Sequence, residues 1–471
     1  MDSTYLILSI FIPLIGSFIC FLFPKGVRDI WAFLAVGISF VFLLLLISPI
    51  AAGKTIAIQL FSQNGRFFNV SFLADGISLI FALVFSFVGM IALIYSLTYM
   101  KRYENQREYY FMITLMIASL IGVAFSQNLV LLYIFWELAA LTTWRLVGFH
   151  REKKIVTIAD KTFLMTFLGS SFMLLGFILL YGETGTLNLM ELKGLQIPGL
   201  NIILFLIFLG IIAKSACLPI HTWLADAHPV APSPMSAILS GVEVEVGIFA
   251  FLRIFSFTFG ISWNWILLLA ILSSLIGAGA ALLEKDIKRI IAYSTVSQIG
   301  YILLGFAVLS KIGLVAGLLY FMIHAVGKAG LFLGAGVVEQ NCEERNIDKL
   351  GGLMKSMPLT GVGFLFCSLS IMGFPPFGGF YAKLLIILAM VKEGHFLIAA
   401  LAILAAILTM LYLFRLFNGI FLGKMSISNK PEKSRSMVGC VVTLGIISLI
   451  MGLFISQIIV LPNIAIASLF K

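Results

Sequence analysis

Six basic side chains of this sequence lie inside or at the edge of long apolar segments, where a charge is costly to bury. Charges in such places usually face the interior of a helix bundle and mark ion paths. These side chains are therefore the first candidates for function, and the rest of the chain must position them. The six are Arg145, Lys214, Arg253, Lys328, Lys383 and Arg415. The three arginines lie near the ends of their apolar segments, where reaching to the membrane surface is the simpler interpretation.

Glu137 stands inside an apolar segment with no opposite charge near it in the sequence. A carboxylate in hydrocarbon must find a cation, and we expect Lys214 on another helix to supply it. Burial favours the neutral lysine and a nearby carboxylate favours the charged one, so a change in their separation would load or release a proton. The alternative is a static ion pair between two helices.

His324 and Lys328 are four residues apart and therefore share one face of a helix. Small neighbours, among them Gly327 and Gly330, allow close helix packing and room for water. Imidazole beside an ammonium group is suited to a proton relay. The alternatives are a packed, hydrogen-bonded histidine and a lysine that reaches toward the surface. Lys383 also lies within an apolar segment, and we interpret it as we do Lys214, as a buried lysine that takes up and releases a proton.

Two further carboxylates, Glu243 and Glu245, are separated by about 200° around a helix and cannot face the same site. We expect Glu245 to face inward, in line with the relay, and leave the direction of Glu243 open. His221 and His228 lie in the turn that follows the proline-broken segment after Lys214, and they are candidates for lining an entrance from the cytoplasm. Capping and turn contacts explain these two histidines equally well.

Composition excludes a water-soluble protein. The 471 residues are 61% hydrophobic and 11% charged, whereas a soluble domain is roughly 25% charged. Five dispersed cysteines without a Cys-x-x-Cys pattern provide no iron–sulfur or zinc framework. Neither a dinucleotide fingerprint nor a P-loop is present. The net charge of +10 comes from short loops, which favours membrane orientation over nucleic-acid binding.

The apolar segments predict an all-α polytopic membrane protein with about fourteen spans, each long enough for roughly 30 Å of hydrocarbon. Most lysines and arginines of the loops fall on one side of the membrane, which is expected to be the cytoplasmic side. We therefore expect a protein of the cytoplasmic membrane with both termini outside the cytoplasm. The spans lie near 4–23, 30–50, 73–97, 109–126, 128–148, 159–181, 200–225, 233–258, 263–283, 287–309, 313–338, 358–390, 395–421 and 437–461.

Prolines predict that two spans are broken, one after Lys214 and one just before Lys383. Two interrupted helices at matching positions are typical of transporters built from inverted repeats. We therefore expect three N-terminal helices (1–108), a five-helix repeat (109–258), a second five-helix repeat (259–421), and a C-terminal loop and helix (422–471).

Five strings stand in a fixed order along the chain: FWELAALTTWRLVGF, KSACLPIHTWLADAHPVAPSPMSAILSG, DIKRIIAYSTVSQIGY, HAVGKAGLFL and GFPPFGGFYAKLL. Together they resemble the antiporter-like membrane subunits of respiratory complex I, Mrp-type sodium/proton antiporters and membrane-bound hydrogenases. The resemblance implies a hydrophilic axis at mid-membrane. Within it, Glu137 and Lys214 match the family's glutamate–lysine pair, His324 and Lys328 its central relay, and Lys383 its terminal lysine.

One position departs from the family pattern. Many members have a lysine where this chain has Glu245, between Val244 and Val246. A carboxylate at this position can still carry a proton, or it can suit Na⁺, because hard cations prefer oxygen ligands. The departure leaves the choice between H⁺ and Na⁺ open.

The resemblance implies an ion-translocating, proton-pumping subunit of a larger respiratory complex of the complex I or membrane-bound hydrogenase type. The expected partners are further antiporter-like and small membrane subunits, hydrophilic redox subunits and lipids, and no nucleic acid. We expect no cofactor or metal in this chain, with iron–sulfur clusters or other redox centres only in partner subunits. This chain would then be a subunit of a redox-driven ion translocase and would carry out no catalytic chemistry itself. The alternatives are a subunit of an Mrp-type Na⁺/H⁺ antiporter without a redox partner and a scaffold that does not pump.

Overall fold

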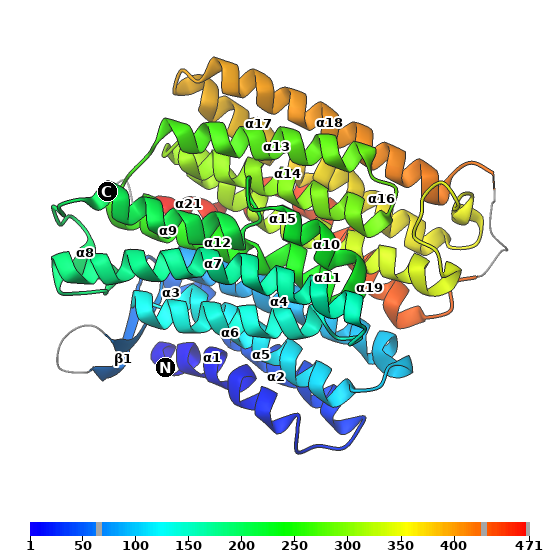
Figure 1. Cartoon of the computed structure of the whole chain (residues 1–471), viewed down its shortest axis with the longest axis horizontal. Helices are drawn as coiled ribbons and strands as arrows, with labels where there is room; N and C mark the ends of the chain where they lie inside the picture. Colours follow the sequence, from blue (N-terminus) through cyan, green and yellow to red (C-terminus); the bar gives the residue numbers. More distant parts are fainter. Residues whose placement is uncertain (63–67, 425–430, 468–471) are drawn as a thin grey trace.

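A computed structural model describes residues 1–62, 68–424 and 431–467 of the chain. Its helices run roughly side by side along one direction, and a two-stranded sheet lies at one end of the bundle (Figure 1). In the described part, twelve helices are long and apolar enough to cross a membrane. The predicted all-helical, polytopic membrane fold is confirmed.

The elements follow one another along the chain in three groups. The first contains α1 (Asp2–Ile19), α2 (Val27–Leu45), α3 (Ile47–Ala51), β1 (Ile56–Ser62), β2 (Asn69–Ala74), α4 (Gly76–Tyr99), the 3₁₀ turn η1 (Met100–Arg102), α5 (Gln106–Phe125) and α6 (Leu129–Val147). The second contains α7 (Lys153–Thr184), α8 (Leu189–Leu192), α9 (Leu200–Lys214), α10 (Thr222–Val230), α11 (Ser233–Ile238), the π-helical η2 (Leu239–Glu243), α12 (Glu245–Phe251), the π-helical η3 (Leu252–Phe259), α13 (Asn264–Leu283), α14 (Ile287–Ala307) and α15 (Lys311–Cys342). The third contains the 3₁₀ turn η4 (Leu353–Lys355), α16 (Pro358–Met372), α17 (Gly378–Lys392), α18 (Phe396–Phe421), α19 (Arg435–Leu453), α20 (Ile455–Ile458) and α21 (Val460–Ala467).

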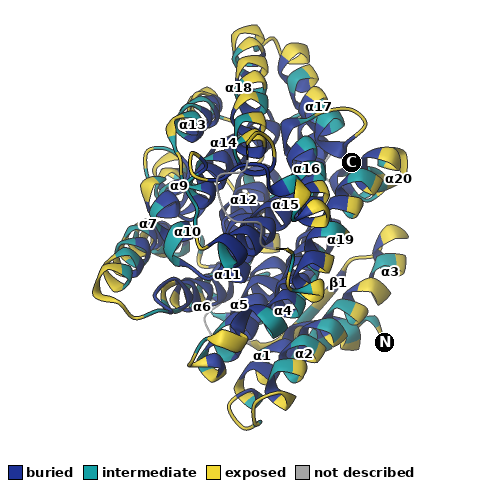
Figure 2. Cartoon of the chain, turned by 90° about the vertical axis from the view of Figure 1, so that its right-hand side faces the viewer, coloured by how far each residue is buried: buried dark blue, intermediate teal, exposed yellow. Residues whose placement is uncertain are grey.

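Burial increases from the rim of the bundle toward its centre (Figure 2). The span formed by α11, η2, α12 and η3 is buried along its whole apolar stretch, and α15 is buried over 89% of its own. By contrast, α1 and α18 are buried over only 33%. The rim helices therefore present apolar side chains to lipid or to neighbouring chains, while the central helices can hold side chains away from both.

Both predicted helix breaks are confirmed. The first separates α9 from α10 around Pro219, and the second separates α16 from α17 around Pro375 and Pro376. Proline lacks the N–H that an α-helix needs, and its ring clashes with the preceding turn. At the second break, Gly373 has a φ of +80°, a conformation that suits glycine.

The span predicted as one regular helix over 233–258 is irregular. It contains two π-helical segments, η2 and η3, on either side of α12. A π-helical turn contains an extra residue, so the side chains that follow it point in new directions. Such segments have no residue signature like the prolines of the breaks, which is why the sequence does not reveal them.

One feature of the N-terminal part also differs from the expectation. The chain between the second and third predicted spans contains an antiparallel hairpin, in which β1 pairs with β2. Asp75 then caps α4 by accepting a hydrogen bond from the Ser78 amide at 2.9 Å. The count of fourteen spans and the division into two repeats stay predictions, because each broken span consists of helices shorter than a membrane crossing.

Candidate functional site

A buried ion pair joins the end of α9 to the π-helical segment η2. Lys214, the last residue of α9, pairs with Glu243, and each side chain is 1% exposed. Thr143 Oγ1 on α6 donates a 3.0 Å hydrogen bond to Glu243 Oε1, and Lys214 Nζ lies 5.7 Å from the centre of the Trp136 ring. Opposite charges offset part of each other's desolvation cost. The charge of each therefore depends on the state of the other.

The expected pairing of Lys214 with Glu137 is wrong, because the carboxylate that Lys214 contacts is that of Glu243. Glu137 lies half-buried on α6, and its Oε1 is buried without a hydrogen-bond partner among the described residues. Glu243 is the last residue of the π-helical segment η2. Sequence spacing alone does not show which of two carboxylates a lysine will meet.

Glu245 and His324 form a second buried contact. Glu245 is the first residue of α12, and His324 lies within α15. Glu245 Oε1 is 2.7 Å from His324 Nδ1, with both side chains fully buried. The geometry is not that of a hydrogen bond, and all four polar atoms of the two side chains lack a hydrogen-bond partner in the described part of the chain. Such atoms are costly to bury unless they share a proton or a water molecule.

The two glutamates do face different partners, as their separation around the helix predicts. Glu245 contacts the central histidine, in agreement with the expected inward direction. Glu243, whose direction was open, is buried as deeply as Lys214. It is therefore a site residue that the sequence placed only among the lower candidates.

Lys328 lies one turn beyond His324 on α15 and is fully buried. Its Nζ donates to the carbonyl oxygen of Ile291 at 3.1 Å and to the hydroxyl oxygen of Ser294, both on α14. Among the described residues no carboxylate forms an ion pair with it. Lys328 is thus held by neutral oxygens in the centre of the bundle.

Lys383 reaches back from α17 across the second break. Its Nζ donates to the carbonyl oxygens of Ile371 at 2.8 Å and of Met372 at 3.5 Å. The last carbonyls of a helix have no partner within the helix and form the negative end of its dipole. The same Nζ lies 5.0 Å from the centre of the Tyr301 ring and 5.6 Å from that of Tyr320. Helix dipole and aromatic faces together hold this ammonium group.

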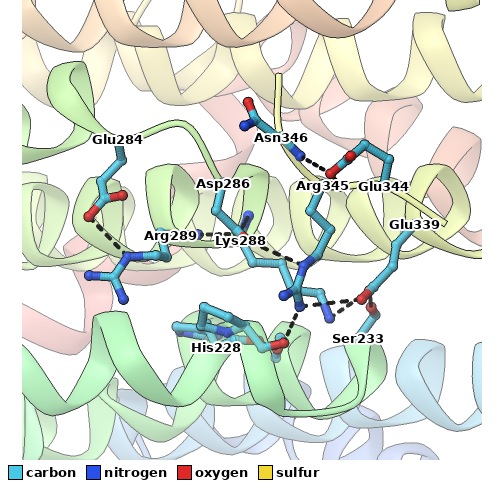
Figure 3. A network of polar contacts seen from close by, with 12 residues as sticks. His228, Ser233, Glu284, Asp286, Lys288, Arg289, Glu339, Glu344, Arg345 and Asn346 are labelled. Atoms are coloured by element: carbon cyan, nitrogen blue, oxygen red, sulfur yellow. Dashed lines mark hydrogen bonds and ion pairs between the residues drawn. The ribbon is translucent and has the colours of Figure 1, made fainter. Parts of the chain in front are cut away.

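A network of charged side chains covers the place where the α10–α11 junction meets α14 and α15 (Figure 3). Lys288 Nζ is 2.8 Å from Glu339 Oε2, and Arg345 Nε is 3.1 Å from Asp286 Oδ2. Arg345 also donates to the carbonyl oxygen of Pro229. These contacts fix the junction against the two long helices.

The two histidines expected near an entrance have different surroundings. His228 is fully buried beside this network, and its ring stacks on Phe332 with the ring centres 4.2 Å apart. Both of its ring nitrogens lack a hydrogen-bond partner in the described structure. His221 lies at the first break, partly exposed, with Nδ1 3.3 Å from the carbonyl oxygen of Pro219. An entrance role for either histidine stays a prediction.

Outside the spans, two carboxylates of the loop after α15 are held in the ionised form. Glu344 accepts hydrogen bonds from the amides of Arg345 and Asn346, at 2.8 and 2.9 Å, and these bonds lower the pKa of its carboxyl. The Asp348 carboxyl is 2.6 Å from Lys285 Nζ, and that bond lowers the pKa of Asp348. The basic side of the chain therefore also contains fixed negative charges.

The three arginines at the span ends bind partners that are distant in the sequence. Arg253 in η3 donates to Asp75 Oδ1 at 2.8 Å, and Arg145 on α6 donates to Glu108 Oε2 at 2.8 Å. Arg415 donates to two carbonyl oxygens at the end of α13, both at 2.8 Å. These contacts tie helices together, and spacing along the chain gives no signal for them.

In the described ranges, no group of three or more His, Cys, Asp or Glu side chains is placed to hold a metal ion. The site is instead a row of single charges and pairs on enclosed helices. Such a row can take up and pass on protons one at a time. That redox centres belong to partner subunits stays a prediction.

Comparison with known proteins assigns the fold to a family. A family model described as NADH:quinone oxidoreductase/Mrp antiporter, transmembrane, matches residues 126–409, which is more than half of the chain. The chain belongs to this family of antiporter-like subunits. A second model, described as the N-terminus of chain 5 of complex I, matches residues 61–111. The first match includes both helix breaks and all the candidate pathway residues.

Relatives of this antiporter-like protein occur in different complexes. A Na(+)/H(+) antiporter subunit of Alkalihalophilus pseudofirmus is 33% identical over 429 residues, covering 82% of this chain and 52% of the relative. NADH-quinone oxidoreductase subunit L of Buchnera aphidicola subsp. Acyrthosiphon pisum is 35% identical over 370 residues, covering 76% of this chain and 59% of the relative. The chain thus spans only 52% and 59% of the length of these two relatives.

A solved structure, the Mrp complex from Dietzia sp. DQ12-45-1b, contains a chain with the same fold. The TM-score is 0.92 at 24% identity, over 100% of this antiporter-like protein and 98% of that chain. At this identity the likeness establishes the fold alone.

Proposed function

We propose that this antiporter-like protein translocates protons within a multi-subunit respiratory membrane complex of the complex I or membrane-bound hydrogenase type. The single observation that carries the proposal is the row of buried ionisable side chains on enclosed helices, between and beside the two breaks. Glu243 joins the path as the partner of Lys214. The path comprises Glu137, Lys214, Glu243, Glu245, His324, Lys328 and Lys383.

The contacts suggest how charge moves along the row. Protonation of Glu243 would remove the negative charge that balances the ammonium group of Lys214 in the core. The unpaired polar atoms of Glu245 and His324 form the next place where a proton can be shared. Beyond them, the like charges of Lys328 and Lys383 repel each other in a medium of low dielectric constant. Adding a proton at one lysine therefore favours release at the other.

The same proposal assigns the surroundings of the chain. With that assignment one side of the chain faces the cytoplasm and both termini lie outside it, which the excess of lysine and arginine in the loops of that side supports. Neighbouring membrane subunits would transmit energy as electrostatic or conformational change. The redox centres that supply this energy would belong to hydrophilic partner subunits.

The decisive experiment replaces Lys328 by Met in the native complex, purified through a tag on this chain and reconstituted into liposomes. We expect the number of protons translocated per turnover to fall, because a neutral side chain cannot pass on a proton. Lys311→Met is the matched control, since Lys311 is exposed at the start of the same helix. An unchanged number of protons per turnover in Lys328→Met would contradict the proposal.

A second candidate is a component of an Mrp-type Na⁺/H⁺ antiporter without a redox partner. The observation that favours it is the carboxylate of Glu245 in the centre of the path, since oxygen ligands suit hard cations. Replacing Na⁺ by choline separates the two candidates. Proton movement that persists without Na⁺ supports the proton-pumping complex, and proton movement that stops supports the antiporter. The unpaired atoms of Glu245 and His324 count against a static scaffold.

A further inference from the structure

A network of neutral side chains begins at Lys328 and leads away from the charged row. Lys328 Nζ donates to Ser294 Oγ, and Ser294 shares a 2.6 Å hydrogen bond with the hydroxyl of Tyr412 on α18. All three side chains are fully buried. A hydroxyl oxygen both donates and accepts, so a proton that leaves Lys328 can be handed on as far as Tyr412.

The other end of the network lies beside the terminal lysine. The hydroxyl of Tyr320 donates to Gln298 Oε1, and the Tyr320 ring centre is 5.6 Å from Lys383 Nζ. Tyr320 precedes His324 by one turn on α15, with the two ring centres 6.4 Å apart. This tyrosine therefore borders both the central relay and the terminal lysine.

Gln298 is the residue that joins the two ends. Its Nε2 donates to the Tyr412 hydroxyl at 3.1 Å and to Thr409 Oγ1 at 3.2 Å, while its Oε1 accepts from Tyr320. The oxygen of an amide only accepts and its nitrogen only donates. Neither atom can take up a proton and pass the same charge on, whichever way the amide group is turned. The hydrogen bonds of Gln298 hold the two tyrosine hydroxyls in place, but its amide group does not let a proton pass from one hydroxyl to the other.

We propose that Gln298 is a positioning residue that keeps the terminal lysine separated from the central relay until its amide moves aside. The inference rests on the proposed proton path. When the amide leaves, the hydroxyls of Tyr320 and Tyr412 can meet directly or through one water molecule. Each hydroxyl then accepts one proton as it gives one up. Once Lys383 has released its own proton and is a neutral amine, the net change is that the ammonium group of Lys328 becomes an amine and the amine of Lys383 becomes an ammonium group. In the closed arrangement the amide prevents protons from leaking between pumping steps.

The test measures passive proton flux through the complete complex in liposomes, under a potassium diffusion potential set with valinomycin and read with an enclosed pH-sensitive dye. Gln298→Glu has nearly the same shape, but its carboxyl group can relay a proton. We expect its passive flux to rise at least fivefold above that of the wild type. Gln298→His provides a second relaying side chain should the first variant fail to assemble, with the same expected rise. Wild-type flux in an assembled relaying variant would overturn the proposal.

Two companion variants separate a proton route from general loosening of the core. Tyr320→Phe added to Gln298→Glu removes the hydroxyl that the new carboxyl group would use, so the flux should return to the wild-type level. Thr409→Val is the matched control. Thr409 Oγ1 accepts from the Gln298 amide and donates to the carbonyl oxygen of Ala405, and valine at this position adds no group that can relay a proton. It should leave the flux unchanged. A leak that persists without the Tyr320 hydroxyl, or one of equal size in Thr409→Val, would contradict the proposal.

Failure of this inference can be told apart from failure of the proposed function. Passive flux requires no energy source and reports only on the connection through Gln298. The Lys328→Met experiment reports on pumping itself. Normal pumping in Lys328→Met would contradict the proposed proton path. Loss of pumping in that variant, together with wild-type passive flux in Gln298→Glu, would contradict only the role of Gln298.

Discussion

The lysines at the two helix breaks are held by different groups. At the first break, Lys214 pairs with Glu243, and Trp223 Nε1 donates a 3.0 Å hydrogen bond to the carbonyl oxygen of Ala213 near the end of α9. At the second break, Lys383 itself donates to the last carbonyls of α16. One break therefore uses a full opposite charge, and the other uses a helix dipole and neutral oxygens.

Two similar helix breaks can therefore serve different steps of proton transfer. A carboxylate compensates a buried ammonium group more completely than carbonyl dipoles do. The pair at the first break is neutral overall and changes when either member gains or loses a proton. Lys383 instead adds a second positive charge to the buried row that contains Lys328, and like charges repel each other in a medium of low dielectric constant. We infer that the first break suits loading of a proton and the second suits its release.

The comparison is tested most strongly at Glu243. Glu243→Gln removes the carboxylate that balances Lys214, and breaking a buried pair by removing one partner costs about 3–5 kcal/mol. We expect a lower midpoint of thermal unfolding for the purified complex, together with loss of proton translocation. Glu137→Gln is the matched control for stability, because Glu137 is half-buried and contributes to none of the described ion pairs. Equal destabilisation by the two variants would contradict the assigned pairing.

Lys383→Met sharpens the comparison at the other break. The substitution leaves two carbonyl oxygens without a donor but also removes a charge that no described carboxylate compensates. We expect a loss of about 1–2 kcal/mol in the free energy of unfolding, which is less than at Glu243. Proton translocation should still be lost. A destabilisation as large as that of Glu243→Gln would show that the two lysines are held equally strongly.

Arg415→Ala should give the smallest loss of stability among the three variants. Arg415 binds two carbonyl oxygens at the end of α13 and lies outside the charged row. Its loss should lower the free energy of unfolding by about 1 kcal/mol and leave the number of protons per turnover unchanged. Reduced pumping at normal stability would extend the functional site to this arginine.

The sequence predicts those parts of the fold that have strong local causes. Apolar length identifies the spans, and proline identifies both breaks, because each acts through a few neighbouring residues. The π-helical segments η2 and η3 were missed, since no residue type requires them. The hairpin of β1 and β2, between the second and third predicted spans, was not predicted.

The candidate site follows the same rule. Glu245, His324, Lys328 and Lys383 were found because a charge in an apolar segment is conspicuous, and all four are buried. Their partners were not found, because ion pairs and hydrogen bonds join helices that are far apart in the chain. The pairing of Lys214 with Glu243 joins α9 to η2, and only the three-dimensional arrangement shows it.

The central claim is that the buried charges carry the ion and do not merely hold helices together. The most direct test is the double variant Lys214→Met with Glu243→Leu, reconstituted as the complete complex. Replacing a buried pair by apolar side chains of similar size is often neutral or stabilising, so the midpoint of thermal unfolding should not fall. The account predicts normal stability with a reduced number of protons translocated per turnover. Normal stability with the full number of protons would contradict it.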